Sequence, residues 1–267
     1  MTDKFFVDGI LNGRVAFVTG GGTGITGGVA RAFAEAGANV ALVSRTLEHL
    51  EPAARSINDT RAGNPNIGEA LAIQADVRNS EQIEEAILAT VVRFGKIDIV
   101  VNGAAGNFLA PAEALSPNGF GTVVDIDLKG TFNVCRAAFA ELKEHRGQIL
   151  NISATLHYLG TPMQLHVSAA KAGVDALTRN LAVEWGRYGI RVNGIAPGPI
   201  EDTEGMKRLV PEPVKEKLLK NIPLGRFGRI GDIEKAALFL CSDAASFING
   251  ALLVIDGGQW LSAARFA

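Results

Sequence analysis

Short apolar segments alternate with longer segments of helical periodicity along almost the whole chain, and this alternation restricts the fold more than any other feature. The apolar segments are residues 15–19, 39–44, 71–74, 98–102, 148–152, 191–195 and 252–255. The helical segments are residues 25–36, 47–58, 81–94, 120–142, 168–186 and 233–240. Strands and helices that alternate at these lengths form βαβ units, and continuously apolar strands are typical of a parallel sheet covered on both faces. The pattern therefore predicts an α/β fold with a doubly wound, seven-stranded parallel sheet.

No linker, internal repeat or low-complexity segment divides the 267 residues, so we expect a single domain over residues 1–267. One irregular insert, residues 199–223, separates the sixth predicted strand from the last predicted helix. Long inserts in compact domains are often functional. We therefore predict a substrate lid at about residues 199–223.

Composition excludes several classes of protein. A net charge of −2 argues against a nucleic-acid partner, which requires a basic face. Two cysteines cannot form a disulfide framework, and no His, Cys and carboxylate cluster has metal-ligand spacing, so no metal is expected. No segment reaches the roughly 20 apolar residues of a membrane span. Because the chain also has no signal-peptide pattern, and its last residues, ARFA, are not a peroxisomal signal, we expect a soluble, cytoplasmic protein.

The strongest local motif is a glycine-rich turn between the first predicted strand and the first predicted helix. Glycines let the backbone approach a pyrophosphate, and a helix N-terminus offers free N–H groups and the positive end of its dipole. Because strand and helix flank the turn correctly, it predicts a Rossmann-type dinucleotide site. The residues predicted to bind the cofactor here are Thr19, Gly20, Gly22, Thr23, Gly24 and Ile25.

Arg45 follows the second predicted strand, where many NAD-binding domains have an acidic residue for the ribose 2′-hydroxyl. An arginine there can bind a 2′-phosphate through a charge-assisted contact, and Ser44 can add a hydroxyl donor. The pair favours NADPH as the cofactor, with NADH as the alternative.

Taken together, these motifs resemble those of the short-chain dehydrogenase/reductases over essentially the whole chain. Further matching segments are Asp76-Val77, NGAAG at 102–106, NIS at 151–153, Lys171 and APGPI at 196–200. The resemblance implies that Asp76 and Val77 lie at the adenine and that Lys171 binds the nicotinamide ribose. It also implies that Asn102, Gly103 and Ala104 lie near the ribose of the adenine, and that Pro197, Gly198 and Ile200 lie near the carboxamide.

The residues at the family's catalytic positions depart from its usual pattern. Val167 stands at the tyrosine position, Ala154 at the serine position and Asp127 at the asparagine position. A ketone reductase needs an acid to protonate the developing alkoxide, and valine cannot supply a proton. Interconversion of ketones and alcohols is therefore disfavoured.

One branch of the family, the peroxisomal-type 2,4-dienoyl-CoA reductases, is similar in the remaining pattern and also lacks the tyrosine and the serine. The similar segments are residues 104–116, 125–133, 154–156, 168–186 and 196–205. The resemblance implies NADPH-dependent reduction of a 2,4-dienoyl-CoA to a 3-enoyl-CoA in the β-oxidation of unsaturated fatty acids. Asp127 would supply a proton through a water, and Lys171 would hold the ribose.

An acyl-CoA partner carries several phosphates, so a basic rim is expected around the pocket. The resemblance suggests that Arg45, Arg78 and Arg208 bind the substrate phosphates and that Phe108, Ser116, Pro117 and Asn118 lie along its acyl or pantetheine path, with Asn107 as a further candidate. His157 and His166 are interpreted as structural. Family members pair their long helices, so a homo-oligomer, a dimer or tetramer, is expected.

Three alternatives remain open. The first is a reductase of 2-enoyl thioesters on CoA or acyl carrier protein, and the second is a non-catalytic NADPH-binding protein. The third is a carbonyl reductase that uses Tyr158, one of the two tyrosines of the chain.

Overall fold

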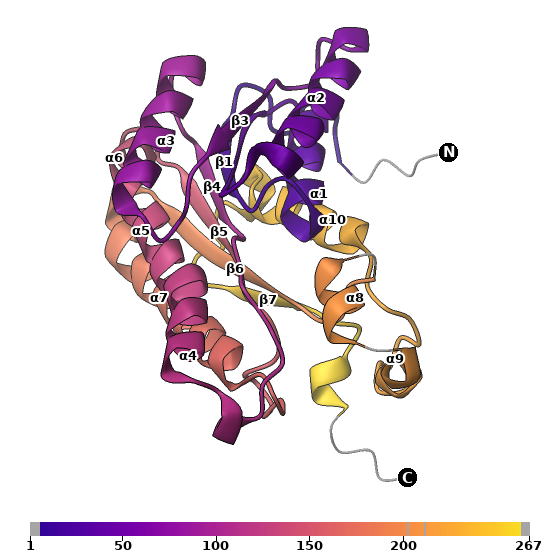
Figure 1. Ribbon diagram of the computed structural model, residues 1–267. Helices are drawn as coiled ribbons and strands as arrows, with labels where there is room; N and C mark the ends of the chain where they lie inside the picture. The colour runs from indigo at the N-terminus through magenta and orange to yellow at the C-terminus, as the bar shows by residue number, and fades with distance from the viewer. Residues whose placement is uncertain (1–5, 202, 211, 263–267) are drawn as a thin grey trace.

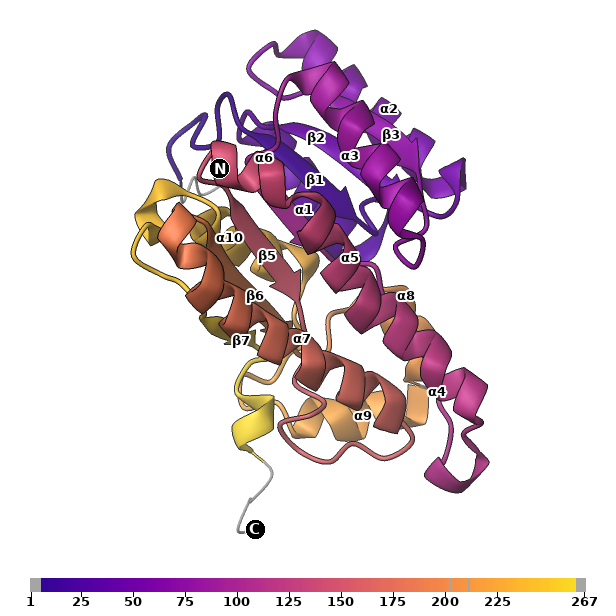
Figure 2. The same ribbon diagram turned by 90° about the vertical axis from the view of Figure 1, so that its left-hand side faces the viewer.

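The computed structural model describes residues 6–201, 203–210 and 212–262, and in this part of the chain a parallel sheet lies between two layers of helices (Figures 1 and 2). The strands are β1 (Val15–Thr19), β2 (Asn39–Ser44), β3 (Ala70–Gln74), β4 (Ile99–Asn102), β5 (Gln148–Ile152), β6 (Arg191–Pro197) and β7 (Leu252–Ile255). Their order is β3-β2-β1-β4-β5-β6-β7, and each neighbouring pair is parallel. The predicted fold class, one domain with a seven-stranded parallel sheet, is confirmed.

The helices are α1 (Gly24–Glu35), α2 (Leu47–Gly63), α3 (Ser80–Phe94), α4 (Pro117–Val124), α5 (Gly130–Ala137), α6 (Phe139–Glu144), α7 (Leu165–Trp185), α8 (Glu204–Leu209), α9 (Glu212–Lys220) and α10 (Ile230–Leu240). Apolar residues of α1, α2 and α10 form one core cluster with one face of the sheet. Residues of α3, α5, α6 and α7 form a second cluster on the opposite face. Both faces of the sheet are thus covered, which explains why its strands are continuously apolar.

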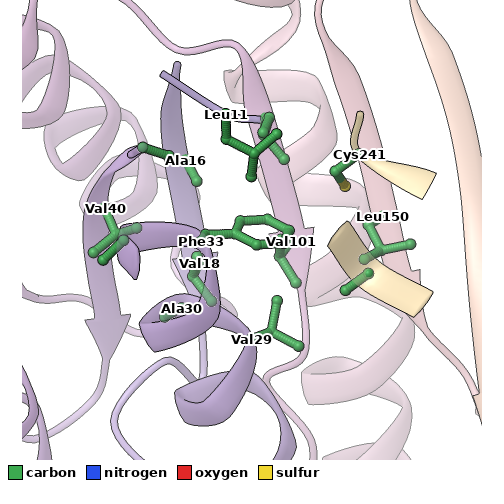
Figure 3. Close-up of a cluster of buried hydrophobic side chains, with 14 of the residues drawn as sticks. Leu11, Ala16, Val18, Val29, Ala30, Phe33, Val40, Val101, Leu150 and Cys241 are labelled. Carbon is green, nitrogen blue, oxygen red and sulfur yellow. The ribbon is translucent and has the colours of Figure 1, made fainter. Parts of the chain in front are cut away.

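Figure 3 shows the centre of the first cluster, where Phe33 of α1 lies among Val18 of β1, Val101 of β4 and Val29. Each of these four side chains is fully buried. Burial of one such side chain stabilises a fold by about 1.5–3 kcal/mol. This packing fixes α1 against β1, and therefore fixes the turn between them.

The chain changes direction across the sheet between β1 and β4. After β1 it adds β2 and β3 on one side, and then returns to place β4 on the other side of β1. Loops that leave neighbouring strands in opposite directions at such a point open a crevice at the carboxyl edge of the sheet. The glycine turn after β1 and the loop after β4 lie at this edge.

The segment 120–142, predicted as one helix, is divided in the structure. It contains the end of α4, a π-helical turn (Asp125–Lys129), α5 and the start of α6. In the π-helical turn, Gly130 N–H donates to the carbonyl of Asp125, five residues earlier. The prediction of a continuous helix is wrong because one extra residue in a helix hardly alters the apolar pattern on either side of it.

The predicted lid contains α8 and α9, which Figure 1 shows beside the lower end of the sheet. Residues 202 and 211 of this insert, and the two ends of the predicted domain, lie outside the described residues. No helix in residues 6–201, 203–210 and 212–262 is both long and apolar enough to span a membrane.

Candidate active site

Two hydrogen bonds hold the end of β1 against the loop after β4, and a third lies within the glycine turn. Thr19 Oγ1 accepts from Gly103 N–H at 3.1 Å and from Ala104 N–H at 3.3 Å, and Thr26 Oγ1 donates to the carbonyl of Gly20 at 2.7 Å. Gly20 has φ +68°, and a Cβ there would lie 2.9 Å from the Gly103 carbonyl oxygen. Only glycine satisfies both conditions, so the turn keeps its backbone free of side chains.

The start of α1 can hold an anionic group. Its N-cap residue, Thr23, makes no side-chain capping hydrogen bond, and no acidic residue lies in the first turn. The first N–H groups of a 12-residue helix therefore point, uncapped by a side chain, toward the crevice. Uncapped N–H groups, a glycine turn without Cβ atoms and the positive end of the helix dipole fit the pyrophosphate of a dinucleotide.

A cleft of about 540 Å³ extends from this turn along the carboxyl edge of the sheet. Its walls contain fourteen of the seventeen residues predicted to bind the cofactor, namely Gly20, Gly22, Thr23, Gly24, Ile25, Ser44, Arg45, Asp76, Val77, Gly103, Ala104, Lys171, Pro197 and Gly198. Thr19 and Asn102 are buried behind the wall, where Asn102 Nδ2 donates to Asn151 Oδ1 at 2.9 Å. Ile200 lines a neighbouring cavity instead.

At the adenine end of the cleft, the carboxylate of Asp76 binds the guanidinium of Arg78. Arg78 Nε donates to both carboxylate oxygens, at 3.0 and 3.1 Å. These hydrogen bonds, with smaller contributions from the charges of Arg78 and Arg45, lower the pKa of Asp76 and so keep it ionised. Arg78 is therefore paired with a predicted cofactor residue, and it does not line the described cavities.

Asp127 and Lys171 meet at the other end of the cleft. Asp127 Oδ2 lies 3.2 Å from Lys171 Nζ, and the two side chains are 0% and 8% exposed. Asp127 Oδ1 accepts from Gly106 N–H at 2.7 Å, while Lys171 Nζ donates to the Ile152 carbonyl at 3.0 Å. The pair comes from different elements, because Asp127 lies in the π-helical turn and Lys171 on α7.

Both positions that would carry a hydroxyl in the usual family pattern lie in the cleft wall. Val167 and Ala154 line the cleft, Val167 packing with Val123 and Ala170 in a small apolar cluster. Tyr158 is not in the wall of either large cavity among the described residues. Its ring contacts His157 and Trp260, and burial, with a smaller effect of the Asp175 charge, raises the pKa of Tyr158 to about 12.

A second cavity of about 610 Å³ adjoins the cofactor cleft. It shares wall residues with the cofactor cleft, among them Asn107, Ala154 and Leu156. Met206 and Val210 from the predicted lid close one side, and Trp260 lies in another wall. The cavity is mostly apolar and adjoins the cleft, so it can hold an unsaturated chain next to a bound dinucleotide.

The structure does not bring the other predicted substrate residues into this cavity. Phe108 packs behind its wall, with its ring centroid 4.4 Å from that of His166. Ser116 accepts from Gly119 N–H as the N-cap of α4, with Pro117 and Asn118 in the first turn of that helix. Arg208, on α8, is exposed and lies outside the cavity walls. Of the predicted substrate residues, Arg45 lines the cofactor cleft, and the further candidate Asn107 lines both cavities.

Two other residues of the site were missed in the sequence. Gln164, just before α7, accepts from Asn107 Nδ2 at 2.9 Å, and both residues line the second cavity. Trp260 follows two glycines in left-handed conformations, Gly257 and Gly258, after β7. That pair of glycines after a strand was the available signal, because it places the following residues at the same edge of the sheet as the other site loops.

A model of a protein family described as enoyl-(acyl carrier protein) reductase matches residues 20–259. A peroxisomal 2,4-dienoyl-CoA reductase of Arabidopsis thaliana, named as (3E)-enoyl-CoA-producing, is 47% identical and aligns with 98% of this chain and 90% of its own length. A protein of the same name from Saccharomyces cerevisiae is 49% identical, over 96% of this chain and 89% of its own. A crystal structure of a short-chain dehydrogenase from Bacillus anthracis has a TM-score of 0.83 at 42% identity and covers 95% of this chain and 99% of that one.

These relatives contradict the expected cytoplasmic location, because the proteins from Arabidopsis and yeast are both named peroxisomal. The expectation depended on the absence of a targeting signal, and the absence of one known signal does not place a protein in the cytoplasm.

Proposed function

The chain belongs to the short-chain dehydrogenase/reductase family, and we propose that it is an NADPH-dependent 2,4-dienoyl-CoA reductase of unsaturated fatty-acid β-oxidation. The observation that carries the proposal is the buried Asp127–Lys171 pair in a dinucleotide cleft whose wall has Val167 in place of the family's tyrosine, with an apolar cavity adjoining that cleft. The names of the two dienoyl-CoA reductases at 47% and 49% identity support it.

A conjugated dienoyl thioester is an acceptor that such a site can reduce. NADPH, when bound, supplies a hydride to the δ carbon. The resulting negative charge spreads through the dienolate to the thioester oxygen, so no alkoxide forms and no tyrosine acid is required. Two tasks remain for the protein, which are stabilising that oxygen and protonating the α carbon to give a 3-enoyl-CoA.

Asp127 and Lys171 line the cofactor cleft, Asn107 lies in the wall that the two cavities share, and these side chains suit the two tasks. Asp127 is held by Gly106 N–H and faces Lys171, and it supplies the proton through a water. Lys171, fixed by the Ile152 carbonyl, binds the nicotinamide ribose. The amide of Asn107, which lines both cavities, donates to the thioester oxygen. In the proposed reaction each group has a separate role, and Val167 serves as an apolar wall.

The choice of NADPH depends on Arg45. Arg45 lies in the cleft wall beside Ser44. Ser44 Oγ donates to the Thr46 carbonyl. The guanidinium of Arg45 is therefore the group at this end of the cleft, in the described part of the chain, that can bind a phosphate by charge. A guanidinium binds a 2′-phosphate, whereas a 2′-hydroxyl gains little from it.

Closure and assembly complete the proposal. Helices α8 and α9 form the substrate lid, because Met206, Val210 and Leu218 reach the second cavity. A homo-oligomer, a dimer or a tetramer, is supported by the exposed apolar side chains Phe132 on α5 and Val183 on α7, which are 47% and 83% exposed.

Oxidation of NADPH, followed at 340 nm with a panel of acyl-CoAs, tests the function. We expect turnover with 2,4-hexadienoyl-CoA and 2,4-decadienoyl-CoA, a 3-enoyl-CoA product, and no turnover with simple ketones. Faster turnover with 2-enoyl thioesters would support the enoyl reductase alternative. NADPH binding without turnover of any thioester would support a non-catalytic protein, and ketone reduction that is lost in Tyr158→Phe would support the carbonyl reductase.

A further inference from the structure

A buried carboxylate on α7 holds the loop that separates the cofactor cleft from the acyl cavity. Asp175 Oδ1 accepts from Ser153 Oγ at 2.5 Å, and Asp175 Oδ2 lies 2.7 Å from His157 Nε2. Asp175 is 2% exposed and is in the wall of neither cavity among the described residues. Its carboxylate therefore faces the loop and leaves the substrate space to other residues.

Ser153 and His157, which contact Asp175, lie at the two ends of the segment that separates the cavities. Ser153 lines the cofactor cleft, and Ala154, Thr155 and Leu156, which follow it, line the acyl cavity. Two backbone hydrogen bonds fix the start of this loop and one turn within it, because Ser153 N–H donates to the Ile195 carbonyl at 2.7 Å and Tyr158 N–H to the Thr155 carbonyl at 3.1 Å. The carboxylate on α7 adds the contacts that fix the side chains of Ser153 and His157.

Side chains from two successive turns of α7 contact this segment. Lys171 donates to the carbonyl of Ile152, the residue before Ser153, and Asp175 lies four residues later, on the same face of the helix. The spacing between the nicotinamide ribose site and the dividing wall is thus set by one rigid helix. His157 extends the contact further, because its ring meets that of Tyr158, which in turn meets Trp260 in the far wall of the acyl cavity.

The arrangement is not a nucleophilic triad. In such a triad a histidine accepts the proton of the serine, whereas here the carboxylate lies between Ser153 and His157 and bonds to each. We propose that Asp175 is a positioning residue, which through Ser153 and His157 holds residues 153–157 at the distance from the nicotinamide that the acyl thioester requires. The choice of substrate in this proposal rests on the proposed function, whereas the contacts of Asp175 with the loop do not depend on it.

Three variants test this role. Asp175→Ala removes both contacts, while Asp175→Asn keeps an oxygen for Ser153 and an amide group for His157 Nε2. Thr178→Val is the matched control, because Thr178 is also buried on α7 but bonds Asn151 of β5 at 2.9 Å instead of the loop. Each variant is assayed well below its own unfolding temperature, so that lost stability does not enter the kinetics.

We expect Asp175→Ala to raise KM for 2,4-dienoyl-CoA or to lower kcat by roughly 10-fold or more, because a misplacement of about 1 Å costs as much as 100-fold in rate. The dissociation constant of NADPH should change less than threefold. Asp175→Asn should recover most of the loss, and Thr178→Val should keep wild-type kinetics. A purely structural aspartate would lower the unfolding temperature and leave both kinetic constants unchanged, and that result would overturn the proposal.

Amide hydrogen exchange supplies a readout that needs no substrate. In the NADPH-bound protein, Asp175→Ala should exchange faster at residues 153–157 than wild type or Thr178→Val, with α7 itself still protected. Unchanged exchange in this segment would overturn the positioning role even if the enzyme proves to reduce another thioester. Faster exchange in a protein that reduces no dienoyl-CoA would uphold the positioning role and refute the proposed function.

Discussion

Replacement of Asp127 by asparagine separates the proton-donating role of this residue from its structural contacts. Asparagine has the same shape, and its amide oxygen can still accept from Gly106 N–H, the 2.7 Å bond that holds the loop after β4. The amide nitrogen would then face Lys171 Nζ, where Asp127 Oδ2 now lies at 3.2 Å. The loop is kept, whereas the carboxyl group that faces Lys171 and can exchange a proton with a water is lost.

The magnitude follows from this loss. General acid catalysis by a positioned group contributes about 10²–10⁴-fold, so the barrier should rise by about 3–5 kcal/mol. We expect kcat with a 2,4-dienoyl-CoA to fall by that factor. Lys171 keeps its bond to the Ile152 carbonyl, so the affinity for NADPH should change by less than roughly 10-fold, which is about 1.4 kcal/mol.

The assay is steady-state NADPH oxidation, combined with NADPH titration by fluorescence. Asp125→Asn is the matched control, because it removes a carboxylate from the same π-helical turn, where Asp125 is half-buried and pairs with Lys129 at 2.6 Å. This control should retain activity within about twofold, since surface substitutions change little. A kcat for Asp127→Asn within threefold of wild type would remove Asp127 from the proton transfer.

Three further predictions concern the cofactor, the thiols and one glycine. Arg45→Ala should raise KM for NADPH about 10- to 100-fold, because one charge-assisted contact is lost. The KM for NADH should stay unchanged. Equal effects on both cofactors would contradict the role of Arg45 in 2′-phosphate binding. Burial raises the pKa of Cys135 and of Cys241 to about 12, so neither thiol should react with Ellman's reagent at pH 8 until denaturant is added. Because the unfolded thiols ionise near pH 9, their contribution to the free energy of unfolding should decrease as the pH rises from about 9 toward 12, as measured by urea unfolding. Gly198→Ala should destabilise the protein by about 1–3 kcal/mol in the same measurement, because its Cβ would lie 2.5 Å from Cβ of Asp256; wild-type stability would show that this contact can relax.

Most of the sheet could be predicted from the sequence because its physical signal is local. Four predicted strands, among them β1 and β5, have the same bounds in the structure, and β6 extends two residues further, to Pro197. An apolar run that ends at a glycine or a charged residue marks a buried strand well. The break in segment 120–142 is different, because it depends on a backbone hydrogen-bond shift that leaves the apolar pattern intact.

Some contacts of the candidate site could likewise be predicted from the sequence, and others could not. Asp127 and Lys171 were expected together, and the structure places their charged atoms 3.2 Å apart. The pairing of Arg78 with Asp76 could not be predicted, because two residues of spacing do not show whether an arginine turns toward its neighbour or toward a ligand. The role of Asp175 was also hidden, since its partners approach from a loop about 20 residues away whose course only the folded chain defines.

Because of the π-helical turn, the geometry of the site depends on how many residues this stretch contains as well as on which residues they are. Each residue of an α-helix advances the rotation by about 100°. The π-helical turn takes up one extra residue by underwinding, so deleting a residue from Asp125–Lys129 would close the turn into a regular α-helix and either remove position 127 or rotate its side chain. The carboxylate at position 127 and the contacts of α5 with the sheet could then no longer face their partners simultaneously. A single-residue deletion here should be more damaging than many substitutions, and among relatives the length of this stretch should vary less than its composition.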